Sequence, residues 1–507
     1  MSSSSRIMLP SEEVEQPRGE SKALLSETYV VKTMPSVLGK GDMTITAVMA
    51  LFLLTNAVSG AGGGPVSLVY LALGAIVFFV PCIVATIQLG VLLPNEGSLY
   101  NWTTRATNRF FGLFIGLCFW LSGVLAVTTA GSAFVTTLQG LNANLLIQPW
   151  QQGVAILFLT FIAAAIGIQR MRMIQNFINL AFILTMISVF LVGGAAVVWL
   201  ATGHHSMTNF ADNAGWVPVP GTFFLFAIIT LNYIGASGPM NLAGELVRRD
   251  PRALVSTIRQ HLLIGAPVVV LLYTIVTTSV LIVRGSSVGP FDGFTAVEQT
   301  LGKVPANIAV ICYLAYLIAA MLFYTYASAR IIMAAGIDQF FPARFAKLNK
   351  HRATVFAVMF HAVATSFVVV VIYIAIPAVI TVGGSPINTT TEFYTVAAAA
   401  CTLIWTIATT FFFVDLVFLY RRNPDKFRRL RQFPLWVIWL SVAVGGAACL
   451  TTIIGILLYP WIPLIGSNVW GFLVGGLTIG IMIVTSVVAM FLSGEADFEQ
   501  FGAVRPQ

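Results

Sequence analysis

One apolar stretch of the sequence, residues 223–250, carries the polar groups best suited to binding a small ligand. Asn232, Tyr233 and Ser237 lie in or beside the segment Gly-Ala-Ser-Gly-Pro at 235–239. Glycine and proline weaken a helix there, and a backbone opened inside a membrane is tolerated only where protein or a water-filled cavity satisfies its polar groups. Free N–H groups at the start of a half-helix suit a carboxylate, so a zwitterion of amino-acid size fits this pattern. The alternative is a kinked packing helix, since Gly and Pro are common in membrane helices.

The elements that must position these groups are membrane-spanning helices. Of the 507 residues, 58% are hydrophobic and only 9% are charged, with a mean hydropathy of +0.89, whereas soluble proteins average about 25% charged residues. The net charge of +8 does not indicate a nucleic-acid partner, because the basic residues lie in short loops between apolar runs. The five cysteines lie in apolar runs without metal or redox spacing, and no phosphate-binding loop is present. We therefore predict an all-α polytopic membrane protein in the lipid bilayer that is not an enzyme and needs no cofactor.

Apolar runs of about 20 residues, the length needed to cross a bilayer, recur about twelve times. The predicted spans are 43–64, 66–92, 104–138, 150–169, 175–202, 220–246, 259–283, 306–334, 354–378, 393–420, 434–458 and 467–493. This count places 25 of the 27 Lys and Arg residues on one side, with only Arg284 and Lys303 on the other. Because basic residues concentrate in cytoplasmic loops, both termini are predicted to be cytoplasmic.

A second weakened span is predicted near the start of the chain. The first span ends in the cluster Gly60–Gly64, which we interpret as an external turn, and a break is predicted nearer its middle, at Thr46–Leu51. Two broken spans five helices apart are typical of an inverted repeat of five plus five helices. The predicted division is a cytoplasmic tail at 1–40, which we expect to be flexible, repeats at 41–202 and 203–421, two further spans at 422–493 and a cytoplasmic tail at 494–507.

Few ionisable residues fall within the spans, where their burial is costly and usually functional. Glu245 ends the sixth span just before Arg248 and Arg249, so it is either the gate of the inner mouth or a solvated carboxylate at a helix end. His361 is either a hydrogen-bonded packing residue or a proton relay. Glu96 is predicted to face solvent.

Three stretches resemble the amino acid–polyamine–organocation transporter superfamily over residues 40–493. Residues 94–102, PNEGSLYNW, resemble its P-x-E-G-G-x-Y-x-W signature, with Ser98 in place of the second glycine. Asn232-Tyr233-Ile234-Gly235 with the later Ala-Gly-Glu and Asp-Pro resembles its broken sixth helix. Residues 328–349 resemble its S-R…A…G…P-x-x-F-A-K pattern, with one alanine between the Ser and the Arg.

The resemblance implies a LeuT-like five-plus-five inverted repeat, broken first and sixth helices that hold the substrate, and alternating access. The implied substrate-binding residues lie at the two breaks: Thr46, Ala47, Met49, Ala50, Leu51, Asn232, Tyr233, Ile234, Gly235, Ala236, Ser237 and Gly238. From the residues themselves, Tyr233 is predicted to act as an aromatic lid that gates the site from above, and Glu245 is the candidate gate below it.

The chain also departs from the family pattern. Residues 48–51, Val-Met-Ala-Leu, replace the usual Gly-Ser-Gly motif, and Ser237 stands where many members have Glu. Phe182 stands where proton-coupled members have Lys, which favours exchange of one solute for another. These features look closest to the glutamate:γ-aminobutyrate antiporter branch.

The resemblance therefore implies a plasma-membrane secondary transporter for amino acids or related amines, acting as an exchanger. A proton- or sodium-coupled symporter is the alternative. A channel would need charged rings or a continuous polar lining, and a sensor would need a signalling domain. The sequence leaves the oligomeric state open.

Overall fold

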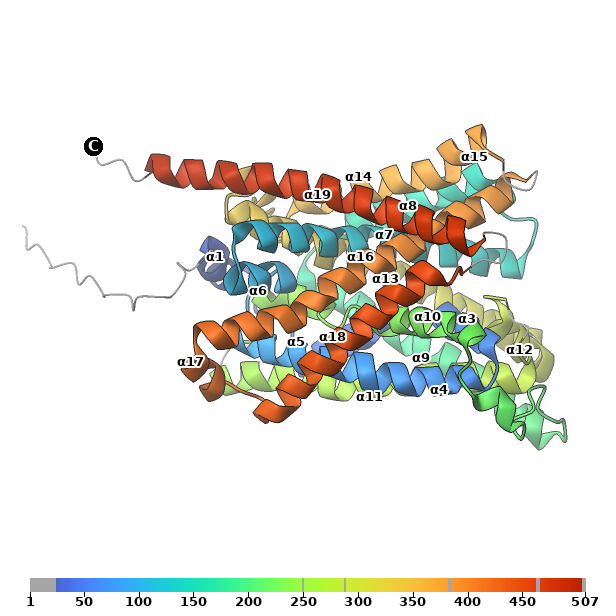
Figure 1. Ribbon diagram of the computed structural model, residues 1–507. Helices are drawn as coiled ribbons and strands as arrows, with labels where there is room; N and C mark the ends of the chain where they lie inside the picture. The colour runs from blue at the N-terminus through green and yellow to red at the C-terminus, as the bar shows by residue number, and fades with distance from the viewer. Residues whose placement is uncertain (1–23, 249, 287–288, 382–384, 462–465, 504–507) are drawn as a thin grey trace, which may run out of the picture.

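The computed structural model describes residues 24–248, 250–286, 289–381, 385–461 and 466–503, and these ranges form helices without a strand. The long helices run side by side along one axis (Figure 1). Those that carry the spans are α2 (Lys40–Leu51), α3 (Leu54–Gly60), η1 (Ala61–Gly63), α4 (Val66–Gly74), η2 (Ala75–Phe79), α5 (Val80–Leu92), α7 (Arg109–Leu141), α8 (Pro149–Gly167), α9 (Met171–Ala201), η4 (Pro220–Thr222), α10 (Phe224–Tyr233), η5 (Gly238–Glu245), α11 (Pro251–Val283), α13 (Lys303–Ile337), α14 (Val355–Val370), η7 (Val371–Ala375), α15 (Ile376–Val379), α16 (Pro386–Arg422), α18 (Leu435–Leu458) and α19 (Ser467–Ala503). Short helices in the connections are α1 (Leu25–Thr33), α6 (Ser98–Ala106), η3 (Asn213–Trp216), α12 (Asp292–Leu301), η6 (Ala343–Phe345) and α17 (Pro424–Arg429).

The prediction of about twelve spans is confirmed. In the described residues, eleven helices are long and apolar enough to cross a membrane, and α2 with α3 and η1 makes a twelfth if this bent pair is one span. The most enclosed span is the broken sixth one, Pro220–Glu245, whose apolar window is 78% buried; α7 and α13 follow with 72% and 67%, and they pack against each other. The window of α19 is only 17% buried, so this helix lies at the periphery and offers its apolar side chains to lipid.

The two ends of the bundle differ in charge. We use "basic end" for the end where α1, α6 and α17 lie, and "opposite end" for the end where α3, α12 and α15 lie (Figure 1). Helix α17 carries Lys426, Arg428 and Arg429 at the basic end. At the opposite end Arg284 is paired with Asp292 at 3.1 Å. The separation of basic residues read from the sequence is thus visible in the arrangement of the helices.

The break in the first span lies slightly later than predicted. Helix α2 continues through the predicted segment Thr46–Leu51, and the extended residues are Phe52 and Leu53, after which α3 begins at Leu54. The two halves are bent by 44°. No glycine or proline lies at this break, so tertiary contacts, described below, must stabilise it. The cluster Gly60–Gly64 forms the end of the span, as expected for an external turn.

The break in the sixth span lies where the sequence places it. Helix α10 ends at Tyr233, and the 3₁₀-helix η5 begins at Gly238. Gly235 has φ +97°, a left-handed conformation that favours glycine. An added Cβ at this position would also lie 2.8 Å from Cζ2 of Trp405. Gly235 is therefore required both by its backbone conformation and by the close approach of α16.

The expectation of a flexible amino-terminal tail is wrong for the part that the structure describes. Residues Leu25–Thr33 form helix α1, which packs across the basic end. The backbone N–H and the hydroxyl of Ser26 donate to Asp338 at 2.8 Å each, and Glu27 pairs with Arg105 at 3.3 Å. The sequence gives little sign of this packing because the partners lie far along the chain. Residues 1–23 and 504–507 of the predicted tails lie outside the described residues.

Candidate functional site

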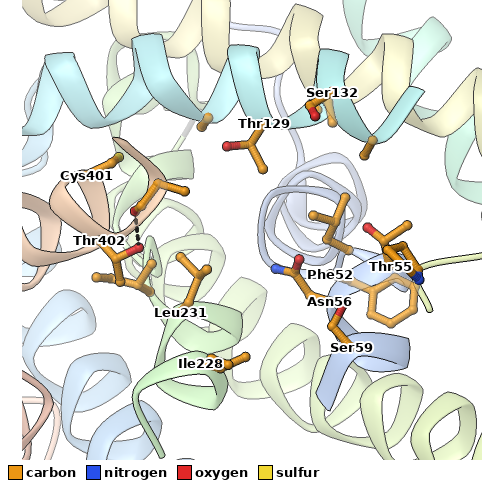
Figure 2. A pocket seen from close by; sticks show the side chains of 18 of the residues that line it. Phe52, Thr55, Asn56, Ser59, Thr129, Ser132, Ile228, Leu231, Cys401 and Thr402 are labelled. Carbon is orange, nitrogen blue, oxygen red and sulfur yellow. Dashed lines mark hydrogen bonds between the residues drawn. The ribbon is translucent and has the colours of Figure 1, made fainter. Parts of the chain in front are cut away.

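A cavity of about 340 Å³ lies between the broken helices and the centre of the bundle. Its walls come from α3, α7, α10 and α16 (Figure 2). It reaches Pro290 and Trp461 at the opposite end, and Ala50, Leu51 and Ile234 line it at the two breaks. The cavity therefore leads from the opposite end to the place where the two breaks meet.

Uncharged polar groups face this cavity from two sides. The amide of Asn56 points into it from α3, and the hydroxyls of Thr129 and Ser132 point toward it from α7 (Figure 2). Thr402 lines the wall formed by α16 and donates its hydroxyl proton to the carbonyl of Ala398 at 2.8 Å. Because that proton is used, the Thr402 oxygen can offer the cavity only its lone pairs.

Aromatic rings line the cavity beside the breaks. Trp405 and Tyr324 line it and lie edge to face, with ring centroids 6.2 Å apart. Trp405 also abuts Gly235, so this indole joins the cavity to the break in the sixth span. Its Nε1 has no hydrogen-bond partner among the described residues. This N–H is buried, so it does not face the cavity in this conformation.

Four tyrosine hydroxyls satisfy the opened backbone of the first span. Tyr273, on α11, donates to the Leu51 carbonyl at 2.9 Å and accepts from the Leu53 N–H at 3.1 Å. The other three hydroxyls belong to α13 and make the following bonds: Tyr324 donates to the Ala50 carbonyl at 2.5 Å, Tyr316 donates to the Phe52 carbonyl, and Tyr313 accepts from the Thr55 N–H at 3.2 Å. Buried backbone groups need such partners, so the tyrosines explain how the helix breaks without a glycine.

The residues predicted to bind substrate fall into three groups. Ala50, Leu51 and Ile234 line the cavity. Thr46, Ala47 and Met49 face neighbouring helices instead, where Thr46 donates to Gln175 at 3.2 Å and Met49 accepts from Thr185 at 3.9 Å. The remaining predicted residues do not line the cavity: Asn232, Tyr233, Gly235, Ala236, Ser237 and Gly238.

Tyr233 is not positioned as a lid over the cavity. Its ring stacks on Phe79 with centroids 4.8 Å apart, and its hydroxyl donates to the Leu71 carbonyl at 3.2 Å. Asn232 and Ser237 differ from it because their buried side-chain polar atoms have no hydrogen-bond partner among the described residues. Buried polar atoms without a partner call for an explanation, and these lie at the sixth break.

A buried cluster of charges closes the basic end below the breaks. Arg330, on α13, pairs through Nη2 with Glu245 of η5 and through Nε with Glu96 at 3.4 Å. All three side chains are almost fully buried, with 1% of the arginine side chain exposed and none of either glutamate. Tyr326 donates to Glu245 at 2.6 Å, and the Gly244 N–H donates to Glu96 at 2.6 Å. We call Glu96, Glu245 and Arg330 the charge cluster.

The charge cluster corrects two expectations. Glu96 does not face solvent, and Glu245 is neither solvated nor paired with Arg248, which donates to the carbonyls of Pro94 and Ala243. Arg249 lies outside the described residues. Burial raises the pKa of Glu96 to about 8, although Arg330 opposes this effect. Two carboxylates around one guanidinium carry a net negative charge unless one of them binds a proton.

Further contacts seal the same end. Ser98 donates to Asn241 at 2.5 Å, and Leu38 forms a parallel bridge with Leu246. A side chain at Gly244 would collide with Val30 of α1 and with Glu96. Helix α1 thus covers the charge cluster from the basic end.

A comparison with known families identifies the family to which this chain belongs. The family model described as amino acid permease matches residues 42–488. The chain belongs to the amino acid permease family. A comparison with curated proteins finds no match. The match covers both breaks, the cavity and the charge cluster, while the whole of helix α1 (Leu25–Thr33) precedes it.

Sequence reasoning missed two features of this permease that the spacing of residues could have indicated. Tyr313, Tyr316 and Tyr324 recur at intervals that place them on one face of a helix, which identifies a polar face on an apolar span. Arg330 falls within a predicted span, where an ionisable residue needs a partner. His361 packs as one of its two interpretations expected, edge to face with Trp120, but the expected hydrogen bond is missing: neither ring nitrogen has a partner among the described residues.

Proposed function

We propose that this permease transports amino acids by alternating access, with the substrate bound where the cavity meets the two breaks. The observation that carries the proposal is the convergence of both broken spans on one cavity that reaches only the opposite end among the described residues. Transporters of this kind place substrate at discontinuous helices near the middle of the membrane. The cavity volume lies at the lower end of the range of about 300–1,000 Å³ for small-molecule sites, which suits a single amino acid.

The charge cluster is the inner gate in this proposal. Arg330 joins α13 to η5 through Glu245 and to the loop before α6 through Glu96, so these elements cannot separate at the basic end while the pairs persist. The excess of basic residues makes the basic end cytoplasmic, and the cavity then faces outward. Transport would require the cluster to break as the opposite end closes over the substrate, a shift between two populated states.

Exchange in the plasma membrane is the transport mode that we favour, since Phe182 occupies the position of the lysine in proton-coupled relatives. One observation favours proton-coupled uptake as a second candidate. Glu96 has a pKa of about 8 in the closed cluster, so it can hold a proton near neutral pH and release it on opening.

The first and sixth breaks also fit a five-plus-five inverted repeat over 41–202 and 203–421.

Counterflow in reconstituted vesicles tests the proposal. Vesicles loaded with one unlabelled amino acid should accumulate the same labelled amino acid without any ion gradient, because exchange needs only internal substrate. A pH gradient should increase uptake into empty vesicles only if the proton-coupled mode is correct. The absence of counterflow for all twenty amino acids and for common amines would reject the proposal.

A further inference from the structure

We infer that the site selects amino acids that carry no net charge, and that it rejects cationic and anionic ones. This inference rests on the proposed function and narrows its substrate class. It is carried by the residues that line the cavity: none of the lining residues that the structure describes is Asp, Glu, Lys, Arg or His. The cavity wall instead contains aliphatic and aromatic side chains with a few amides and hydroxyls.

The polar groups suit the two charges that every amino acid carries on its backbone. Asn56 points an amide N–H₂ into the cavity, and this donor is suited to a carboxylate. The hydroxyl oxygens of Thr402 and Thr395 have donated their protons to the carbonyls of Ala398 and Thr391, so they present acceptors to an ammonium group. The wall therefore supplies donors and acceptors for a zwitterion without an ionised side chain.

A third charge, on the substrate side chain, would find no ionised partner. Burial of an unpaired charge is among the largest penalties in protein energetics, and a membrane interior increases it. Two buried charged groups of the bundle have partners of their own: Arg330 is held by Glu96 and Glu245, and Asp415 accepts from Thr103 at 2.8 Å. They also lie outside the lining of the cavity.

Glu392 needs separate consideration because it lies on α16 near the cavity and has an unpaired Oε1. It is buried, with 6% of the residue exposed, but it is not a lining residue, whereas Tyr394 and Thr395 are. A substrate in the cavity therefore meets hydroxyls and not the carboxylate at this part of the wall.

The apolar part of the wall indicates the side chains that fit best. Ile228 and Leu231 face the cavity from α10, opposite the hydroxyls of α7 (Figure 2), and Trp405 and Tyr324 add aromatic surface. These groups favour aliphatic, thioether or aromatic substrate side chains. Glutamate carries the extra charge, so the inference separates this chain from the glutamate-exchanging branch that its motifs resemble.

Pairs of amino acids with similar shape and different charge test the inference. Counterflow should be measured for glutamine against glutamate and for methionine against lysine at the same concentrations. We expect the neutral member of each pair to be transported about 100-fold more efficiently or better, the scale on which sites discriminate against a group they cannot pair. Glutamate or lysine within tenfold of its partner would overturn the inference and leave amino acid transport intact. No flux of any amino acid would reject the proposed function as well.

A charge placed in the wall gives an independent test. Thr402→Asp should raise lysine counterflow relative to methionine by at least tenfold, because the new carboxylate pairs with the lysine ammonium. Thr402→Val is the matched control, since it removes the hydroxyl without adding a charge: it should lower the counterflow of both substrates alike and leave the lysine-to-methionine ratio of the parent unchanged. If size-exclusion chromatography shows that Thr402→Asp is misfolded, Ser132→Asp places the same charge in the cavity wall from α7 (Figure 2). An unchanged lysine-to-methionine ratio in a folded Asp variant would contradict the placement of the substrate.

Discussion

Arg330→Met should open the basic end, because it leaves the buried carboxylates of Glu96 and Glu245 without the guanidinium that lies between them. Breaking a buried ion pair by removing one partner costs about 3–5 kcal/mol. Glu96 can lower this cost by binding a proton, since its pKa is already about 8. We therefore expect the lower value, about 3 kcal/mol, which reduces the ratio of closed to open molecules roughly 100-fold.

Distances between spin labels across the basic end measure this change. Lys40, at the start of α2, and Lys350, before α14, are both exposed and suit labelled cysteine substitutions once the five buried native cysteines have been replaced. Double electron–electron resonance should show one closed distance in the parent protein and a longer population in Arg330→Met.

Arg172→Gln is the matched control for this measurement. Arg172 pairs with Asp42 at 3.1 Å, but 59% of its side chain is exposed. An exposed pair of this kind contributes about 0–1 kcal/mol, so its loss should leave the distances unchanged. If Arg330→Met gave the same distances as the control, the charge cluster would not be what holds the basic end closed.

Three further predictions concern the gate and the breaks. The closed state holds an extra proton on Glu96 below pH 8 and loses it as the pH rises through 8. The population with the longer spin-label distance should therefore increase between pH 6 and pH 9, because the ratio of open to closed molecules rises by up to about tenfold per pH unit. Glu96→Gln should remove this pH dependence. Gly235→Ala should abolish substrate binding measured by calorimetry, whereas Gly203→Ala, at a similar φ of +86° with open space around it, should bind normally; normal binding by both variants would reject the site. Tyr273→Phe strands the Leu51 carbonyl and the Leu53 N–H, so it should destabilise the protein by about 1–3 kcal/mol, seen as a lower thermal midpoint in detergent than for the exposed control Tyr29→Phe; equal midpoints would contradict the role given to Tyr273.

Structural features that arise from neighbouring residues could be predicted from the sequence. The apolar runs predicted the spans, because a helix must satisfy its own backbone in lipid. Gly235 and Pro239 predicted the sixth break, because glycine permits the left-handed backbone found there and proline lacks a backbone donor. The asymmetry of Lys and Arg residues predicted which loops lie together at one end of the bundle. Each of these inferences needs only the identity of neighbouring residues or the number of Lys and Arg residues in each loop.

Features that depend on distant partners were decided by the tertiary structure. The first span breaks at Phe52–Leu53 because tyrosines from α11 and α13, more than 200 residues away, replace its backbone hydrogen bonds. Glu245 pairs with Arg330, 85 positions further along the chain, and not with the nearby Arg248. A buried carboxylate without a partner is costly, so it pairs with the cation that lies beside it in the folded bundle. Which cation that is depends on how the helices pack and not on the distance along the sequence.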